Sequence, residues 1–265
     1  MKGIDATEKL RVSVATYNQV VFPHPENGTI MLALERKASV LEDGSISVLA
    51  QPFGGGIRIL DATSLKRIIG GIQFDSEQSE QDQDFRILIP PSKWESVKQY
   101  CLHRLEKPDD SELEATPDRE LVEEFEEAFH TRLKPNQYTV QPMGIVIEED
   151  SVQTKNWYAR GWLTVRIYRT FKVQLLDSEV CTSMLTTSQA CSDRDLGQIA
   201  LEDFHIGGRG RANSVLALPL NSVTETYLAL PLEKRYGRTM VESHYLDESV
   251  LAVLGDVDVP QYQRI

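Results

Sequence analysis

Residues 116–130 of the chain read TPDRELVEEFEEAFH, and the rest of the sequence is best approached from this stretch. Its apolar residues recur with the spacing of one buried helical face; they are Leu121, Val122, Phe125, Ala128 and Phe129. Thr116 followed by Pro117 predicts the start of a helix, with the threonine as its cap. The stretch therefore predicts an amphipathic helix.

The opposite face of this predicted helix is crowded with acids. Its four carboxylates are neighbours at helical spacings: Glu120, Glu123, Glu124 and Glu127. Each like-charge pair costs about 0.2–0.5 kcal/mol in an isolated helix. Two interpretations stand side by side. The acids simply face water, or they surround a hard divalent cation such as Mg²⁺, which prefers oxygen ligands.

The order of residues favours the second interpretation. Residues 119–124, Arg-Glu-Leu-Val-Glu-Glu, resemble the helical half of the Nudix box, G-x5-E-x7-R-E-U-x-E-E-x-G-U, in which U is aliphatic. Upstream, residues 51–56 read QPFGGG and resemble the Pro-Gly-Gly segment that leads into that box. Without the helix, the three glycines would read as a corner or as a close approach of the backbone to another group.

The chain departs from the box at several positions. Leu105 and Ser111 stand where the opening glycine and the first glutamate belong, and Glu126 stands at the second glycine. An insertion at about residues 61–115 reconciles these departures, because it would separate the glycine turn from the acidic helix. Such an insertion serves either as a packed decoration or as a lid that contacts a substrate or partner.

The resemblance implies a fold and a reaction. The fold is of the α/β (α+β) class, a mixed sheet sandwiched between helices, in a single domain spanning 1–265. The reaction is attack by water on the diphosphate linkage of a nucleoside diphosphate derivative, with Mg²⁺ or Mn²⁺ as cofactor. A binding domain without catalysis, which takes a nucleotide or a protein partner, is the alternative. The resemblance also allows a homodimer.

Individual roles follow from the same resemblance. Glu123 and Glu124 would be metal ligands, and Glu120 would be a ligand or a base. Arg119 would orient the glutamates by a salt bridge. The glycine turn would bind substrate through Gly55 and Gly56, and the carbonyl of Gly56 would complete the metal shell.

A second glycine-rich segment, GGRGRAN at residues 207–213, carries two arginines. Arg209 and Arg211 suit bidentate capture of phosphate oxygens, which would place a small phosphorylated metabolite or nucleotide nearby. An exposed basic turn is an equally good interpretation of the same residues.

Composition limits the function further. The formal net charge is −12 over 265 residues, which argues against a general nucleic-acid binder because such proteins need a basic footprint. Three widely spaced cysteines give no zinc signature and indicate reduced thiols. The sequence shows neither a bilayer-spanning apolar run nor a signal-peptide core. We therefore expect a cytoplasmic protein without a membrane partner.

Apolar periodicity predicts most of the remaining elements. Strands are expected at 10–22, 29–36, 45–50, 138–148, 157–176 and 214–218. Helices are expected from a capping box at Ser92 to about Glu106, at 178–190 and at 220–236. Residues 75–84 contain five acids and no apolar residue, which predicts a solvated or disordered loop.

Overall fold

The first strand, β1 (Leu10–Pro23), lies at the centre of the sheet and pairs with several segments along its length. It runs parallel to β6 (Leu163–Leu175) and antiparallel to β2 (Ile30–Val40) and β4 (Arg86–Ile89). Both faces of β1 are mostly buried, as expected for a strand covered on two sides. The structure is a computed structural model that describes residues 9–107, 109–153 and 161–265.

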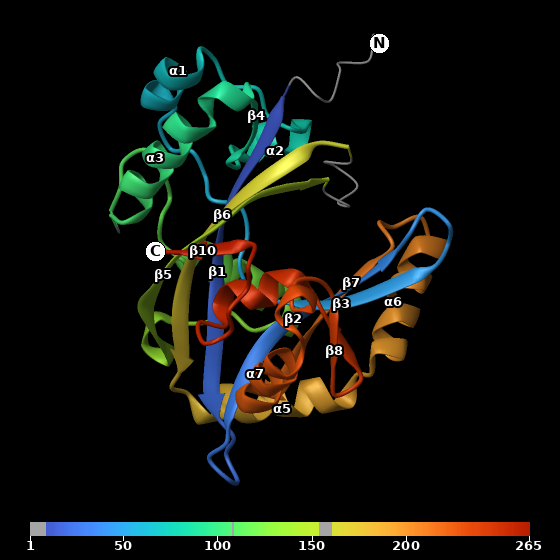
Figure 1. Ribbon diagram of the computed structural model, residues 1–265. Coiled ribbons are helices and arrows are strands. Elements are labelled where there is room, and N and C mark those ends of the chain that lie inside the picture. Colours follow the sequence, from blue (N-terminus) through green and yellow to red (C-terminus); the bar gives the residue numbers. More distant parts are fainter. Residues whose placement is uncertain (1–8, 108, 154–160) are drawn as a thin grey trace.

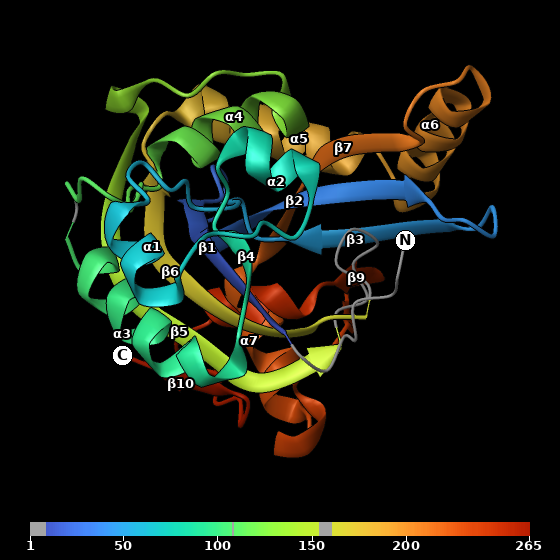
Figure 2. The same cartoon turned by 90° about the horizontal axis from the view of Figure 1, so that it is seen from above.

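The other strands extend this centre into one curled mixed sheet, which confirms the predicted α/β class (Figures 1 and 2). Their order is β10-β5-β6-β1-β2-β3-β9-β8, while β7 pairs with the other edge of β2. These further strands are β3 (Ile46–Gln51), β5 (Tyr138–Gln153), β7 (Arg211–Pro219), β8 (Thr239–Val241), β9 (His244–Leu246) and β10 (Tyr262–Arg264).

Helices cover both faces of the sheet, as Figure 2 shows with α4 and α5 on one side of β1 and β2 and α7 on the other. The α-helices are α1 (Thr63–Ile69), α2 (Glu77–Asp82), α3 (Trp94–Leu105), α4 (Asp118–Phe129), α5 (Ser178–Ala190), α6 (Asp193–His205) and α7 (Leu220–Ala229). The 3₁₀ turns are η2 (Pro91–Lys93), η3 (Pro135–Gln137), η5 (Leu232–Lys234) and η6 (Glu248–Val253). In the described part of the chain, no helix is long and apolar enough to cross a membrane.

The predicted helix around residues 116–130 is α4, and its buried face is the expected one. Leu121, Phe125, Ala128 and Phe129 are buried against residues of β1, β2, β6 and β7. The predicted cap is wrong, because the residue before the helix is Pro117 and no side chain caps it. Pro117, expected as the first helical residue, has helical dihedral angles, and Asp118 follows it as the first residue of α4.

Residues 61–115, predicted to be an insertion, are packed into the molecule. Figure 1 shows α1, α3 and β4 together at one end of the sheet. Their apolar residues share one core with β1, β5 and β6, and β4 adds a strand beside β1. The capping box predicted at Ser92 is absent, because Ser92 lies inside the turn η2 and α3 begins at Trp94.

Part of the acidic stretch 75–84 is helical, so the predicted loop is wrong there, while Glu77 and Glu80 are exposed to solvent as predicted. Residues 77–82 form α2, which Ser76 caps through the backbone N–H of Ser79. Asp75 forms an ion pair of 2.7 Å with the buried Arg11 of β1. Contacts with distant parts of the chain thus compensate charges that composition alone assigns to solvent.

The other predicted elements are present; α5 has the predicted bounds, 178–190, and other elements have shifted ends. The C-terminal helix α7 ends at Ala229 and not at 236, because Pro231 follows and has no N–H to continue it. The strand predicted from 157 begins at Leu163, and residues 157–160 lie outside the described ranges. Apolar periodicity does not predict α6, since only Leu196, Gly197 and Ala200 of that helix are buried.

Candidate active site

The triple-glycine segment lies against β1, and its backbone takes part in the sheet. Thr16 donates its N–H to the carbonyl of Gly55 at 2.9 Å, and Asn18 donates to the carbonyl of Phe53 at 2.8 Å. Gly54 has φ = 144°, and a Cβ there would overlap the carbonyl of Thr16. Of the two roles considered for the glycines, the structure therefore shows the close backbone approach.

Helix α4 lies directly against this glycine turn. Gly54 donates its N–H to Oε2 of Glu124 at 2.5 Å. A Cβ at Gly55 would overlap the carboxylate of Glu120, and a Cβ at Gly56 would lie 2.9 Å from the carboxylate oxygens of Asp84. Three acids from two segments therefore approach a stretch of backbone that has no side chains to keep them away.

Arg119 connects the acids of α4 to the same turn. Its guanidinium forms ion pairs with Glu120, with Glu123 at 3.0 Å and with Glu114 at 2.7 Å. It also donates from Nη2 to the carbonyl of Gly56 at 3.3 Å. The structure thus brings together Arg119, its two neighbouring glutamates and the Gly56 carbonyl.

Glu124 has a further partner on the central strand β2. Nζ of Lys37 lies 3.3 Å from Oε1 of Glu124 and 2.8 Å from Oε2 of Glu35. Glu35 is fully buried, and Gln51 donates to its Oε2 at 3.2 Å. Its Oε1 is buried and has no hydrogen-bond partner among the described residues.

Burial changes the acidity of these carboxyl groups. It raises the pKa of Glu124 to about 8, against the attraction of Lys37 and with a contribution from Glu35. It also raises the pKa of Glu120, to which the nearby Asp84 adds, and the pKa of Asp84 itself. Water therefore stabilises these charges poorly, and a cation in the site would be favoured.

Glu35, Lys37 and Asp84 were not predicted as site residues. Residues 35–37, Glu-Arg-Lys, interrupt an otherwise apolar strand, and charged residues in a buried strand were the available signal. Asp84 lies at the end of the stretch that was expected to be a solvated loop. Its burial depends on α2 and β4, which place it beside Gly56.

The two arginines predicted to bind phosphate lie at the start of β7, where Arg211 pairs with Ser39 of β2, two residues from Lys37. Arg209 is exposed in the turn after α6, and Arg211 is the first residue of β7. Gly210 anchors this turn by donating its N–H to Asp203 at 2.9 Å and accepting from Val40 at 2.9 Å. Figure 2 shows this end of β7 near α6, away from the ribbon between β3 and α1 that carries the glycines.

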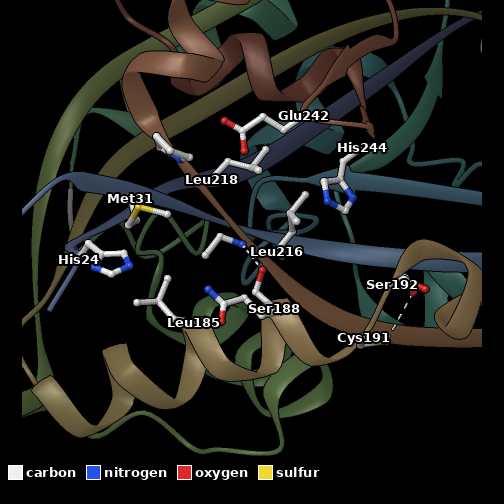
Figure 3. Close-up of a pocket in the computed structure, with 13 residues that line it drawn as sticks. His24, Met31, Leu185, Ser188, Cys191, Ser192, Leu216, Leu218, Glu242 and His244 are labelled. Carbon is white, nitrogen blue, oxygen red and sulfur yellow. Dashed lines mark hydrogen bonds between the residues drawn. The ribbon is translucent and has the colours of Figure 1, made fainter. Parts of the chain in front are cut away.

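A pocket of about 410 Å³ lies beside β7, between α5 and the turn that joins β8 to β9 (Figure 3). Nδ1 of His244, on its wall, lies 3.0 Å from a carboxylate oxygen of Asp193, and the same oxygen accepts from Arg36 at 3.0 Å. None of the predicted site residues lines this pocket. The pocket and the acidic site are therefore separate features.

Over the ranges that the structure describes, no three His, Cys, Asp or Glu side chains are grouped as around a metal ion. Comparisons of the chain with protein-family models, with curated proteins and with solved structures found no match. Function therefore has to be inferred from the residues of the site and their contacts.

Proposed function

We propose that the chain is a Mg²⁺-dependent hydrolase that cleaves the diphosphate linkage of a nucleoside diphosphate derivative where α4 meets Gly54–Gly56. One observation carries the proposal: the carboxylates of Glu120 and Glu124 lie against the glycine turn, with side chains only 15% and 13% exposed. Acids that merely faced water would not be held against backbone in this way.

The residue types at the turn are those that a hard divalent cation takes, although the described side chains are not grouped around a metal position. Glu120, Glu123 and Glu124 would hold it together with the carbonyl of Gly56, since Mg²⁺ and Mn²⁺ take carboxylate and carbonyl oxygens. Each carboxylate has about four lone-pair sites, so the existing partners of Glu124 leave capacity for a ligand bond. When bound, the ion would neutralise phosphate charge and lower the pKa of the attacking water.

Residues of the chain would hold the glutamates in position and remove a proton from the attacking water. Gly55 and Gly56 present backbone without side chains, which allows the carboxylates of Glu120 and Asp84 to approach the turn closely. Arg119 fixes Glu120 and Glu123 relative to the Gly56 carbonyl. Glu120 would accept the proton of the attacking water, because burial raises its pKa toward the range in which a carboxylate works as a general base.

The charge balance of the site favours a second candidate function, binding of a nucleotide or a protein partner without cleavage. Arg119 already supplies a cation to Glu120 and Glu123, and Lys37 supplies one to Glu124. Because Arg119 and Lys37 already neutralise the glutamates, the site could bind a ligand without a metal ion. It would then lack the positive charge that the hydrolysis reaction needs. A homodimer, as predicted from the resemblance, is compatible with either function.

Hydrolysis assays separate the two candidates. We expect the purified chain to cleave at least one member of a panel of nucleoside diphosphate sugars, dinucleoside polyphosphates and nucleoside triphosphates when Mg²⁺ or Mn²⁺ is present. Chromatography of the nucleotide products, with and without EDTA, is the measurement. Calorimetric binding of a panel member without any cleavage would replace the hydrolase by the second candidate.

Gly55→Ala tests the contact between the glycine turn and α4. The new methyl group would overlap the carboxylate of Glu120 and displace it by about 1 Å, which we expect to lower kcat/KM roughly 10²-fold. Gly255→Ala is the matched control, because its Cβ would meet only Met143 at 3.9 Å. If both variants retained wild-type kinetics at equal thermal stability, Glu120 would have no role in the reaction.

A further inference from the structure

The buried acid Glu35 needs a compensating cation. Its side chain is 0% exposed, and an unpaired carboxylate in such a position costs several kcal/mol. Lys37, two residues along the same strand, supplies the positive charge at 2.8 Å. Strand geometry explains the pairing, because residues two apart project from the same face.

The same ammonium group also serves Glu124 of α4, at 3.3 Å. One nitrogen within reach of both carboxylates keeps an oxygen of each facing a common point. Glu35 and Glu124 together carry two negative charges when ionised, and Lys37 neutralises one of them. One negative charge is then uncompensated, and the other oxygen of Glu35, Oε1, has no donor among the described residues.

We infer that Lys37 is a built-in cation that fills a divalent-ion site formed by Glu35 and Glu124, so that replacing Lys37 by a neutral residue opens that site to Mn²⁺ or Mg²⁺. Two carboxylates, one from β2 and one from α4, are ligands of the type that these ions take. A divalent ion would neutralise both acids completely, where the single charge of Lys37 does not. Lys37 therefore prevents a divalent ion from binding between Glu35 and Glu124.

The arrangement also assigns Lys37 a positioning role. It holds Oε1 of Glu124 while the N–H of Gly54 holds Oε2, so both oxygens of this glutamate have fixed partners. Glu120 and Glu123, which pair with Arg119, form the other end of the site. A divalent ion in the wild-type protein would accordingly bind Glu120, Glu123 and the side of Glu124 that faces away from Lys37.

Counting bound Mn²⁺ tests the inference. Free Mn²⁺ is followed by electron paramagnetic resonance during titration of the wild type, Lys37→Met, and Lys37→Met combined with Glu35→Gln. We expect Lys37→Met to bind one more ion than the wild type, and the double variant to lose that ion. Equal counts for the wild type and Lys37→Met, or an extra ion kept by the double variant, would overturn the inference.

Folding provides a second readout. Lys37→Met should melt at a lower temperature than the wild type in EDTA and recover in Mn²⁺, because the ion replaces the missing charge. Failure of this variant to fold even with Mn²⁺ counts against the inference. Glu35→Gln alone should bind as many ions as the wild type, and loss of an ion there would show that Glu35 already serves a divalent metal.

The inference rests on the proposed function only in placing divalent ions near α4, and the two can fail separately. Mn²⁺ counts do not require turnover. Absence of hydrolysis with an extra ion in Lys37→Met would remove the hydrolase and keep the built-in cation. Metal-dependent hydrolysis together with equal numbers of bound Mn²⁺ in the wild type and Lys37→Met would keep the hydrolase and remove the built-in cation.

Discussion

Replacing Glu124 by glutamine is expected to lower kcat/KM for Mg²⁺-dependent cleavage on the order of 10³-fold, because a lost metal ligand removes several kcal/mol of transition-state stabilisation. Glutamine has the shape of glutamate and can still accept the N–H of Gly54, so the contact between α4 and the glycine turn is kept. What the variant loses is the negative charge. Steady-state kinetics at saturating Mg²⁺ measure the effect.

Glu126→Gln is the matched control for this prediction. It makes the same substitution on the same helix, at an exposed residue that lies outside the contacts with the glycine turn. We expect it to leave kcat/KM unchanged. Glu123→Gln should fall between the two, since that side chain is 55% exposed. Wild-type activity in both Glu123→Gln and Glu124→Gln would remove the proposed mechanism.

The largest effect on stability is expected at a second buried acid, Glu148 of β5. Its side chain is 0% exposed and pairs with Arg166 of β6 at 3.1 Å. Tyr168 donates to it at 3.3 Å, and Tyr236 donates to its other oxygen. Arg166→Met would leave this carboxylate without its cation, which costs roughly 3 kcal/mol of the free energy of unfolding. Urea denaturation at neutral pH is the measurement.

A double variant isolates the cause of that loss. Arg166→Met combined with Glu148→Gln removes both charges and keeps an acceptor for the two tyrosine hydroxyls. We expect it to be clearly more stable than Arg166→Met alone. Equal destabilisation of the single and double variants would show that packing of the arginine stem, and not the uncompensated charge, holds this part of the sheet together.

Local pattern was sufficient for much of the fold and for one half of the candidate site. The buried face of α4 follows from the 3.6-residue period, and the hairpin between β2 and β3 follows from Asp43-Gly44, where Gly44 has φ = 78°. The carboxylates of α4 and the three glycines were both visible in the sequence. Each of these signals is carried by residues close together in the chain.

The sequence did not show which distant residues would contact the acidic helix and the glycine turn. Lys37 and Glu124 are 87 positions apart, and Asp84 reaches Gly56 only because α2 and β4 fold back onto β1. No capping side chain precedes α4, which begins at Asp118 after Pro117. Arg209 looked like a phosphate ligand, yet its loop is anchored to Asp203 and Val40 and its side chain is exposed.

The acidic helix, the glycine turn and the alternating strands follow from local sequence, since side-chain periodicity and backbone freedom act over a few residues. Which charges compensate one another depends on how distant segments pack in three dimensions. Burial changes the free energy of a charge by several kcal/mol, and whether a carboxylate is buried or meets a lysine depends on contacts between distant segments. Glu35 illustrates the difference, because nothing in the order of residues around it predicts that it shares one ammonium group with α4.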